Sequence, residues 1–365
     1  MTPIKRNGLV CIVLASLAGL AGCSSSNHVA YVTLGQGNTI AAFRVDNHSG
    51  NLTKIVGSPF NAGNSPISML VHPSNKFAYA ANQIGNDISL FTIDQSTGAL
   101  TEVGPRAPAG IAPAFLVMDS GGHFLFAANQ ASNSISVYSI DGAKGTLTEI
   151  QGSPFVTGAN PVALAITPSG KFLYVATPNL QSVFGYLVTS GGLQPVPNSP
   201  VLVDVGPVSI AVDPAGHFLY VANFIANTLS VLAIDPNSGA LTAIAGSPFI
   251  TCTSTTTACT NNPVWIAIHP SGKFLYTANK GTSNVSVFSI ASTTGVPTQI
   301  TGSPFATGTA PVFASVDSTG RFLFIGNQSS KNITGFSINQ STGALPAGVV
   351  GATTTSAPTS MITTK

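Results

Sequence analysis

Charged side chains are scarce in this 365-residue chain, because Asp, Glu, Lys and Arg together make up 7% of it. Without Lys5 and Arg6, which lie in the N-terminal segment described below, the 13 basic residues fall to 11 and equal the 11 acidic residues. A protein without a basic surplus lacks the electrostatic footprint of a nucleic-acid-binding protein. No nucleic-acid partner is therefore expected, and the polar surface has to come from Ser, Thr, Asn, Gln and Gly.

Glutamate is especially rare, with only Glu102 and Glu149 in the whole chain. Hydrolysis of an ester or lactone needs a general base and donors for the developing oxyanion, so few residues qualify. The chain also lacks a Gly-x-Ser-x-Gly elbow, a phosphate-binding Gly loop and a His-Glu-x-x-His motif. These absences exclude the corresponding hydrolase, nucleotide-binding and zinc-peptidase mechanisms, and no cofactor is predicted.

Cysteine is limited to four residues, of which Cys11 and Cys23 lie near the N-terminus. Cys252 and Cys259 lie in a Thr-rich stretch, 251–260, and in an oxidising compartment they would most simply form a disulfide that staples one loop. A metal site is the alternative interpretation. No His, Asp or Glu stands between or beside these two Cys, so no metal is predicted.

Helical periodicity is absent, and a repeat takes its place. Copies of the segment from His269 to Asn279, His-Pro-Ser-Gly-Lys-Phe-Leu-Tyr-Thr-Ala-Asn, recur along the chain. Their central Phe residues are Phe77, Phe124, Phe172, Phe218, Phe274 and Phe322. Tyr31 precedes Tyr79 by one further period and marks a seventh copy. A fixed period of about 48 residues with strand-like content indicates a closed radial array.

Each unit reads as four short antiparallel strands, most clearly between residues 262 and 312. The pattern predicts strands at Pro263–Ile268, Phe274–Ala278, Val285–Ile290 and Val296–Ile300, with Gly and Pro in the intervening turns. The segment Gly302-Ser-Pro-Phe305 then leads to the next unit. Four-stranded units apolar on both faces are blades of a β-propeller, so we predict an all-β, seven-bladed β-propeller of four-stranded antiparallel blades.

The ring is expected to close through its C-terminus. The last unit has predicted strands near 322–326, 332–338 and 344–350, and the segment from Ala357 to Ile362 then resembles the first-strand pattern from Ser65 to Leu70. The first unit, near His28, lacks an innermost strand of its own. We therefore expect the C-terminal strand to supply it.

The N-terminus has the order of a secretory signal, since Lys5 and Arg6 precede the apolar stretch 8–20. Leu20-Ala21-Gly22-Cys23 resembles the lipobox of bacterial lipoproteins, which implies a signal peptide at 1–22 and a lipid on Cys23; an ordinary signal peptide with a chance Cys is the alternative. Residues 23–27 would be the lipidated Cys and a short linker, and 28–365 the single propeller domain. The expected location is the cell envelope, at the outer membrane facing periplasm or surface.

Several strings resemble the seven-bladed β-propeller lactonase family, which includes 6-phosphogluconolactonase-like and YVTN-repeat proteins. They are Tyr31-Val-Thr33, Tyr220-Val-Ala-Asn223 and Tyr276-Thr-Ala-Asn279, with His72-Pro73 and His269-Pro270 before second strands. The resemblance to the family's active members implies that channel-mouth groups would include an Arg and a His after Gly-Pro at the start of a first strand, and a Glu after Val-Asn at the end of a second strand. This chain has neither arrangement at those places.

The residues that follow the second strands are where the copies differ. They are predicted to surround the channel mouth and to be the ligand-binding residues: Gln83, Gln130, Phe224, Lys280 and Gln328. The preceding Asn of each copy is expected to bond loop backbone within its own blade, Trp265 to pack on an innermost strand, and every His to be a solvent-facing turn residue. The insertion that holds Cys252 is either a tolerated surface loop or a lip over the mouth.

Two functions stay open at this point, and the catalytic residues stay unknown. The first is a binding or interaction module of the cell envelope without the family's usual catalytic groups, for a small neutral polar ligand or an envelope protein. The second is a lactonase acting on a sugar lactone through other groups, such as Lys280, Arg106 or Asp204.

Overall fold

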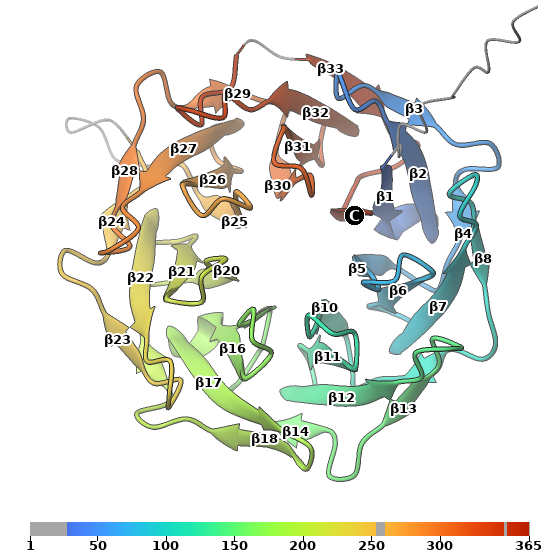
Figure 1. Cartoon of the computed structure of the whole chain (residues 1–365), viewed down its shortest axis with the longest axis horizontal. Helices are drawn as coiled ribbons and strands as arrows, with labels where there is room; N and C mark the ends of the chain where they lie inside the picture. Colours follow the sequence, from blue (N-terminus) through green and yellow to red (C-terminus); the bar gives the residue numbers. More distant parts are fainter. Residues whose placement is uncertain (1–27, 253–259, 347–348, 365) are drawn as a thin grey trace, which may run out of the picture.

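A computed structural model describes residues 28–252, 260–346 and 349–364 of the chain. The predictions for the signal peptide, for Cys23 and for Cys259 lie outside these residues. Seven small sheets stand around a central channel like the blades of a propeller (Figure 1), so the predicted fold class is confirmed. We number the blades 1 to 7 in the order in which their second strands occur in the chain.

The strands have the following bounds, given for blades 1 to 7 in turn. The innermost strands are β34 (Ser360–Thr363), β5 (Pro66–Val71), β10 (Pro113–Met118), β15 (Ala163–Ile166), β20 (Pro207–Val212), β25 (Pro263–Ile268) and β30 (Pro311–Val316). The second strands are β1 (Val29–Leu34), β6 (Phe77–Asn82), β11 (Phe124–Asn129), β16 (Phe172–Thr177), β21 (Phe218–Asn223), β26 (Phe274–Asn279) and β31 (Phe322–Asn327). The third strands are β2 (Thr39–Val45), β7 (Asp87–Ile93), β12 (Ser134–Ile140), β17 (Ser182–Thr189), β22 (Thr228–Ile234), β27 (Asn284–Ile290) and β32 (Asn332–Ser337). The outer strands are β3 (Leu52–Lys54), β8 (Leu100–Glu102), β13 (Leu147–Glu149), β18 (Gly192–Pro195), β23 (Leu241–Ala243), β28 (Pro297–Gln299) and β33 (Val349–Thr353).

Blades 1 to 6 also carry a two-residue strand that the sequence did not predict. These strands pair with the third strand of their own blade: β4 (Phe60–Asn61), β9 (Ala107–Pro108), β14 (Phe155–Val156), β19 (Val201–Leu202), β24 (Phe249–Ile250) and β29 (Phe305–Ala306). They begin at the last residue of the Gly-Ser-Pro-Phe segments and at the corresponding positions of blades 2 and 4, which were expected to be plain connections. In blade 6 the Ser303 hydroxyl accepts a hydrogen bond from the Val287 N–H at 2.9 Å, and four other blades repeat this bond.

Two single-turn 3-10 helices, η1 (Gly35–Gly37) and η2 (Pro178–Leu180), complete the elements of the described ranges. None of the described helices is long and apolar enough to cross a membrane.

The core lies between the blades, because the second strands are buried on both faces. In β26, Leu275 packs into the cluster shared with blade 5 and Tyr276 into the cluster shared with blade 7. The Tyr276 hydroxyl donates to the Gly343 carbonyl of the next blade. Four more Tyr at this position make the same bond, so the repeated Tyr joins each of these blades to the next one.

The ring closes as predicted. Strand β34 pairs antiparallel with β1, with Thr33 opposite Ser360 and Ala30 opposite Thr363. The Thr33 hydroxyl lies 2.7 Å from the Ser360 hydroxyl and accepts from the Ser360 N–H at 3.0 Å. The two ends of the described chain therefore share blade 1.

Blade 7 departs from its predicted boundaries. The expected fourth strand near 344–350 is observed as β33, which begins at Val349. Thr353 pairs with Asn332, at the end of the third strand where the short strands pair in other blades. Leu345 is buried at the outer-strand position, but Pro346 follows it and has no N–H for a ladder bond.

Candidate functional site at the central channel

The strand directions define two faces of the ring. The innermost strands begin, and the second strands end, at what we call the loop face, which carries Gln83 and the residues equivalent to it. The opposite face carries the turns at His72 and Asp119, and we call it the turn face. Figure 1 views the ring along the channel that joins the two faces.

The five predicted ligand-binding residues do lie where the channel begins. The backbone N–H of each donates to the residue just before the first-strand Pro of its blade, as Gln83 does to the Ser65 carbonyl at 2.9 Å. The same bond is made by the other four, Gln130, Phe224, Lys280 and Gln328. The Gln83 Nε2 and the Gln130 Oε1 are 3.5 Å apart, so two of the five side chains meet across neighbouring blades. Their role in binding a ligand stays a prediction.

The Asn residues beneath them are structural, but not through the predicted partners. Asn82 is buried, and its Nδ2 donates to the Asp87 carboxylate at 2.6 Å and the Ser89 hydroxyl at 2.9 Å. Four further blades repeat this arrangement with Asn129, Asn223, Asn279 and Asn327. The partners are therefore third-strand side chains rather than loop backbone. No amide at this position points freely into the mouth in the described part of the chain.

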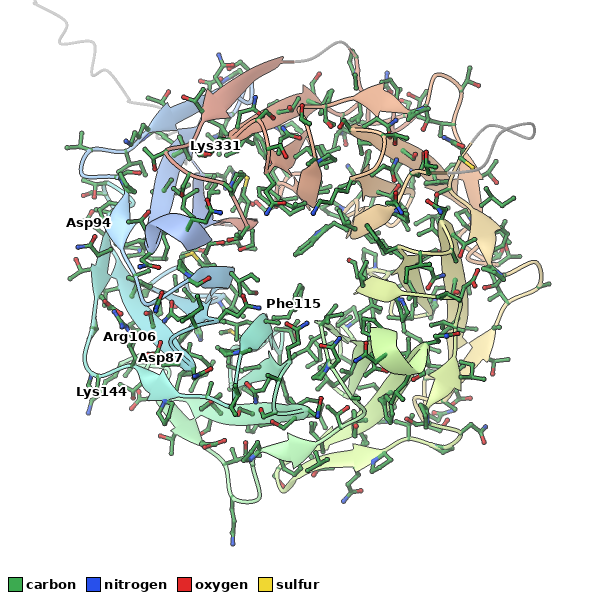
Figure 2. All side chains as sticks on the ribbon, turned by 180° about the vertical axis from the view of Figure 1, so that it is seen from behind. Asp87, Asp94, Arg106, Phe115, Lys144 and Lys331 are labelled. Atoms are coloured by element: carbon green, nitrogen blue, oxygen red, sulfur yellow. The ribbon has the colours of Figure 1, made fainter. Side chains whose placement is uncertain are left out.

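An aromatic pair lies across the channel. Phe115 of blade 3 and Trp265 of blade 6 have ring centroids 5.6 Å apart, and Figure 2 shows Phe115 projecting toward the middle of the ring. Both are third residues of their innermost strands, near the loop face. Trp265 packs, as predicted; the sequence did not identify Phe115 as its partner, because the two lie in blades far apart in the chain.

A cavity of about 450 Å³ lies on the turn-face side of this pair. Its lining runs from Ser68, Phe115 and Trp265 to the turn residues Pro73 and Ser120, and includes none of the five predicted ligand-binding residues. Met69, Met118 and Met361 also line it. Polarisable, flexible Met side chains adapt to ligands of different shape.

Among the described residues, His72 and Asp119 are the two titratable side chains that line this cavity. The His72 Nε2 lies 3.1 Å from the Gly122 carbonyl of the next blade, and its Nδ1 lies 2.8 Å from the Ser74 hydroxyl. The Asp119 carboxylate accepts from the N–H groups of His123 and Phe124 in its own turn. Both groups are thus held by hydrogen bonds that stabilise the turns, and neither is an evident general base.

The prediction that every His faces solvent is wrong for His72 and His269, which are 7% and 4% exposed. The His269 Nε2 lies 2.8 Å from the Gly320 carbonyl of blade 7, in the same way as His72 joins blade 2 to blade 3. His48, His123 and His217 are exposed, as expected. His28 is half-buried beside the Thr364 carbonyl.

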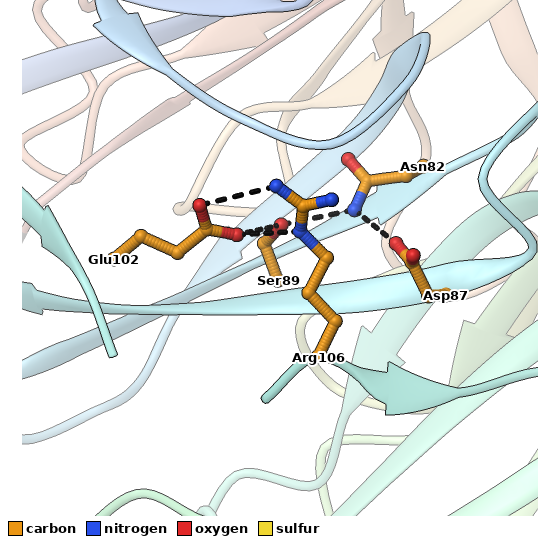
Figure 3. Close-up of polar contacts among 5 residues, drawn as sticks. All are labelled: Asn82, Asp87, Ser89, Glu102 and Arg106. Atoms are coloured by element: carbon orange, nitrogen blue, oxygen red, sulfur yellow. Dashed lines mark hydrogen bonds and ion pairs between the residues drawn. The ribbon is translucent and has the colours of Figure 1, made fainter. Parts of the chain in front are cut away.

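The three groups considered for an alternative lactonase are not brought together. Arg106 lies at the outer rim of blade 2 (Figure 2), Asp204 accepts from the Thr228 hydroxyl at 2.9 Å in blade 5, and Lys280 is exposed on blade 6. Arg106 donates to Glu102 at 2.7 and 3.2 Å, and Glu102 also accepts from Ser89 (Figure 3). Burial by itself would raise the pKa of Glu102, but the hydrogen bonds from Arg106 and Ser89 lower it.

No group of three His, Cys, Asp or Glu that could hold a metal ion is present among residues 28–252, 260–346 and 349–364. The two ends of the Thr-rich insertion are joined, because the Asn261 Nδ2 donates to the Thr251 carbonyl at 2.8 Å.

Comparison with known proteins gives one family and one fold. The family model described as "Lactonase, 7-bladed beta-propeller" matches residues 22–164 and 157–361. No curated protein sequence matches the chain. A solved structure from Bacteroides fragilis NCTC 9343, named as a candidate 6-phosphogluconolactonase, has a TM-score of 0.81 at 21% identity and covers 94% of this chain and 99% of its own.

Two further solved structures are similar at lower identity. The periplasmic gluconolactonase of Pseudomonas aeruginosa has a TM-score of 0.78 at 17% identity, covering 93% of this chain and 99% of its own. The hydrazine synthase of Kuenenia stuttgartiensis has a TM-score of 0.62 at 16% identity and covers 84% of this chain and 94% of its own. Likeness at these identities shows the fold alone, and proteins with different activities share it.

Proposed function

The chain belongs to the family of seven-bladed β-propeller lactonases, and from that premise we propose that it is an exported, lipid-anchored member that binds a small neutral molecule at its central channel without hydrolysing it. The observation that carries this proposal is the state of the two titratable groups in the channel cavity. His72 and Asp119 are both held by turn and inter-blade hydrogen bonds. A base that activates water has to reach its substrate with a free lone pair.

The rest of the channel is suited to a neutral ligand. The cavity walls are largely apolar, through Phe115, Val117 and Trp265, and a volume of about 450 Å³ falls within the range of small-molecule sites. At the loop face, Gln83 and Gln130 offer amide donors and acceptors without net charge. These features match sugars or other neutral molecules better than phosphorylated ones.

A lipid on Cys23 would orient the ring. The described chain begins at the turn face, where His28 lies beside Thr364 and Thr363 lines the cavity. The five residues from Cys23 to His28 span at most about 17 Å. The turn face would thus face the membrane and the loop face would point away from it. The envelope location and the Cys252–Cys259 disulfide remain part of the proposal.

The sole Trp provides the test of binding. Because Trp265 lies in the channel, its fluorescence in purified residues 24–365 should change when neutral sugars and lactones are titrated, and Phe115→Ala should weaken that response. Trp265→Phe controls for signals from elsewhere. Saturable binding without turnover is the expected result, and an unchanged signal with all neutral probes would contradict the proposal.

A lactonase activity is the second candidate, because the family model and two neighbours carry that name. Phosphogluconolactone and simpler lactones should be tested beside an uncatalysed blank. Turnover clearly above the blank would replace the binding function by a catalytic one. Lys280→Ala, Arg106→Ala and Asp204→Ala would then show whether any of those groups takes part.

A further inference from the structure

Four of the six short strands carry a Phe at the same position, and blades 2 and 4 have a smaller side chain there. Strand pairing gives the equivalent positions without reference to sequence similarity, because each lies opposite the second residue of its third strand. Phe60 is opposite Ile40, Phe155 opposite Ile135, Phe249 opposite Leu229 and Phe305 opposite Val285, while blade 4 has Val201 opposite Val183. In blade 2 the residue opposite Ile88 is Ala107.

The aromatic ring at this position fills the space between two blades. Phe155 lies over Gly192, at the start of the outer strand of blade 4, so closely that a Cβ on Gly192 would come 2.1 Å from the ring. Gly192 precedes Leu193, which pairs with Val188. Thr146 precedes Leu147, which pairs with Ile140 in blade 3. Thr146 is therefore the counterpart of Gly192, and a Phe at position 107 would lie against it.

A second cavity occupies this space. It measures about 450 Å³ and lies between blades 2 and 3, with Ala107 and Thr146 in its lining. Leu90, Val103 and Leu147 form much of its apolar wall. We call it the rim cavity. Its position and its apolar wall are what remain when the aromatic ring of the other blades is replaced by a methyl group.

Polar groups surround the opening left by the ring. Arg106 stands at the position of the Pro that precedes the aromatic residue in other blades, and it lines the rim cavity together with Thr148 and Glu149. A guanidinium has five N–H donors, and Glu102 takes two of those of Arg106. The charge of Arg106 is balanced by Glu102, and Glu149 adds a negative charge. The cavity therefore has no positive surplus to attract an anion.

We propose that the rim cavity is a binding site for small neutral molecules that carry one aromatic ring. The ring takes the place of the missing Phe against Ala107 and Thr146, and a hydroxyl or carbonyl of the ligand lies toward Arg106 and Thr148. The site is separate from the central channel, since it lies between the outer parts of two blades, and it does not depend on what the channel binds.

Benzyl alcohol is the probe, and ligand-observed NMR on residues 24–365 is the measurement. Ala107→Phe restores the residue that four other blades carry, so the variant should fold with a melting temperature no lower than the parent and should bind benzyl alcohol at least tenfold more weakly. Ala306→Phe adds the same ring at an exposed position of a short strand in blade 6 and should keep the affinity within twofold.

Thr146→Phe fills the same space from blade 3 and gives an independent second test, expected to weaken binding at least tenfold. Benzoate should bind at least threefold more weakly than benzyl alcohol, because the cavity has no cationic surplus. Equal affinity of the parent and both filled variants, or no binding to the parent, would overturn the site. Tighter binding of benzoate would overturn the neutral ligand class.

Discussion

Closure of the ring by β34 can be tested with two Met residues at equivalent positions. Met361 on β34 and Met69 on β5 each lie three residues after the first-strand Pro, and they are 7% and 6% exposed. Met69 belongs to a strand that continues directly into its own blade, whereas β34 is joined to the rest of blade 1 only by strand pairing and side-chain contacts. The same Met→Ala change at both positions therefore separates the loss of packing from the loss of closure.

The magnitude follows from burial. Truncating a buried Met to Ala costs about 2–5 kcal/mol, and we expect about 3 kcal/mol for each variant. Unfolding a ring of roughly 340 residues carries an entropy of about 0.7 kcal/mol/K, so the melting temperature should fall by about 4 °C. Thr33→Val should cost about as much, because it leaves the buried Ser360 N–H and hydroxyl without the partner they have at 3.0 and 2.7 Å.

Closure adds a local effect that packing alone does not. In Met361→Ala, but not in Met69→Ala, the amide protons of β1 should exchange faster under native conditions, because β34 can leave without unfolding a whole blade. Hydrogen exchange followed by mass spectrometry reads this difference. Deleting residues 357–365 should lower the melting temperature by more than either substitution, and a peptide of residues 356–365 should restore it. An unchanged melting temperature after the deletion would refute the closure argument.

Three further predictions concern the scaffold. Tyr79→Phe removes a 2.6 Å hydrogen bond to the next blade and should cost about 1–3 kcal/mol in urea denaturation. Tyr276→Phe, where the bond is 3.4 Å, should cost less, and the reverse order would contradict the role of these hydroxyls in joining neighbouring blades. Ala112 and Gly206 hold the same position with φ of 56° and 77°. Ala112→Gly should thus stabilise by about 0.5 kcal/mol and Gly206→Ala destabilise by about 1–2 kcal/mol, and shifts of the same sign in both variants would refute a backbone cause. The lowered pKa of Glu102 means that the unfolded chain takes up its proton first as pH falls. The stability that the Glu102 carboxylate adds to the folded state is present above about pH 4.3 and is lost as pH falls below it. In melting curves from about pH 6 to pH 3, the Glu102→Gln variant should therefore lose less stability on acidification than the parent. The difference should be less than about 1 kcal/mol, because the group is partly exposed.

The sequence predicts the blades because their strands are local. The Phe-Leu-Tyr pattern with Pro and Gly turns defines β25 at the observed bounds and β26 to within one residue. The short strands escape prediction because two residues after a Pro contain no periodicity. They form only because the third strand leaves its edge open at that end. Blade 7 differs because Pro346 interrupts the outer strand.

Side-chain roles across blades are what the sequence could not supply. His72 precedes a Pro in a polar turn, which favours an exposed residue, but its partner is the Gly122 carbonyl of the next blade, fifty residues on. The Asn side chains donate to third-strand side chains of their own blade rather than to loop backbone, which is a local pairing that the sequence alone does not distinguish. The backbone positions of Gln83 and its counterparts follow from the period alone. A register-based alignment of the Ser-Pro-Phe segments would have identified Ala107, and the sequence contains that signal.

Several departures from the repeat lie on the border between blades 2 and 3. Gln83 meets Gln130 at the loop face, Phe115 crosses the channel, and Ala107 with Arg106 opens the rim cavity. Because each blade packs mainly against its two neighbours, a substitution at one outer border should leave the other outer borders unchanged. Both cavities contact this pair of blades, one on the inner side and one on the outer side. A ligand in the rim cavity would contact these two blades alone, and its binding would therefore stabilise this border above the others. Hydrogen exchange with and without benzyl alcohol should show added protection confined to blades 2 and 3, whereas protection spread evenly around the ring would contradict the site.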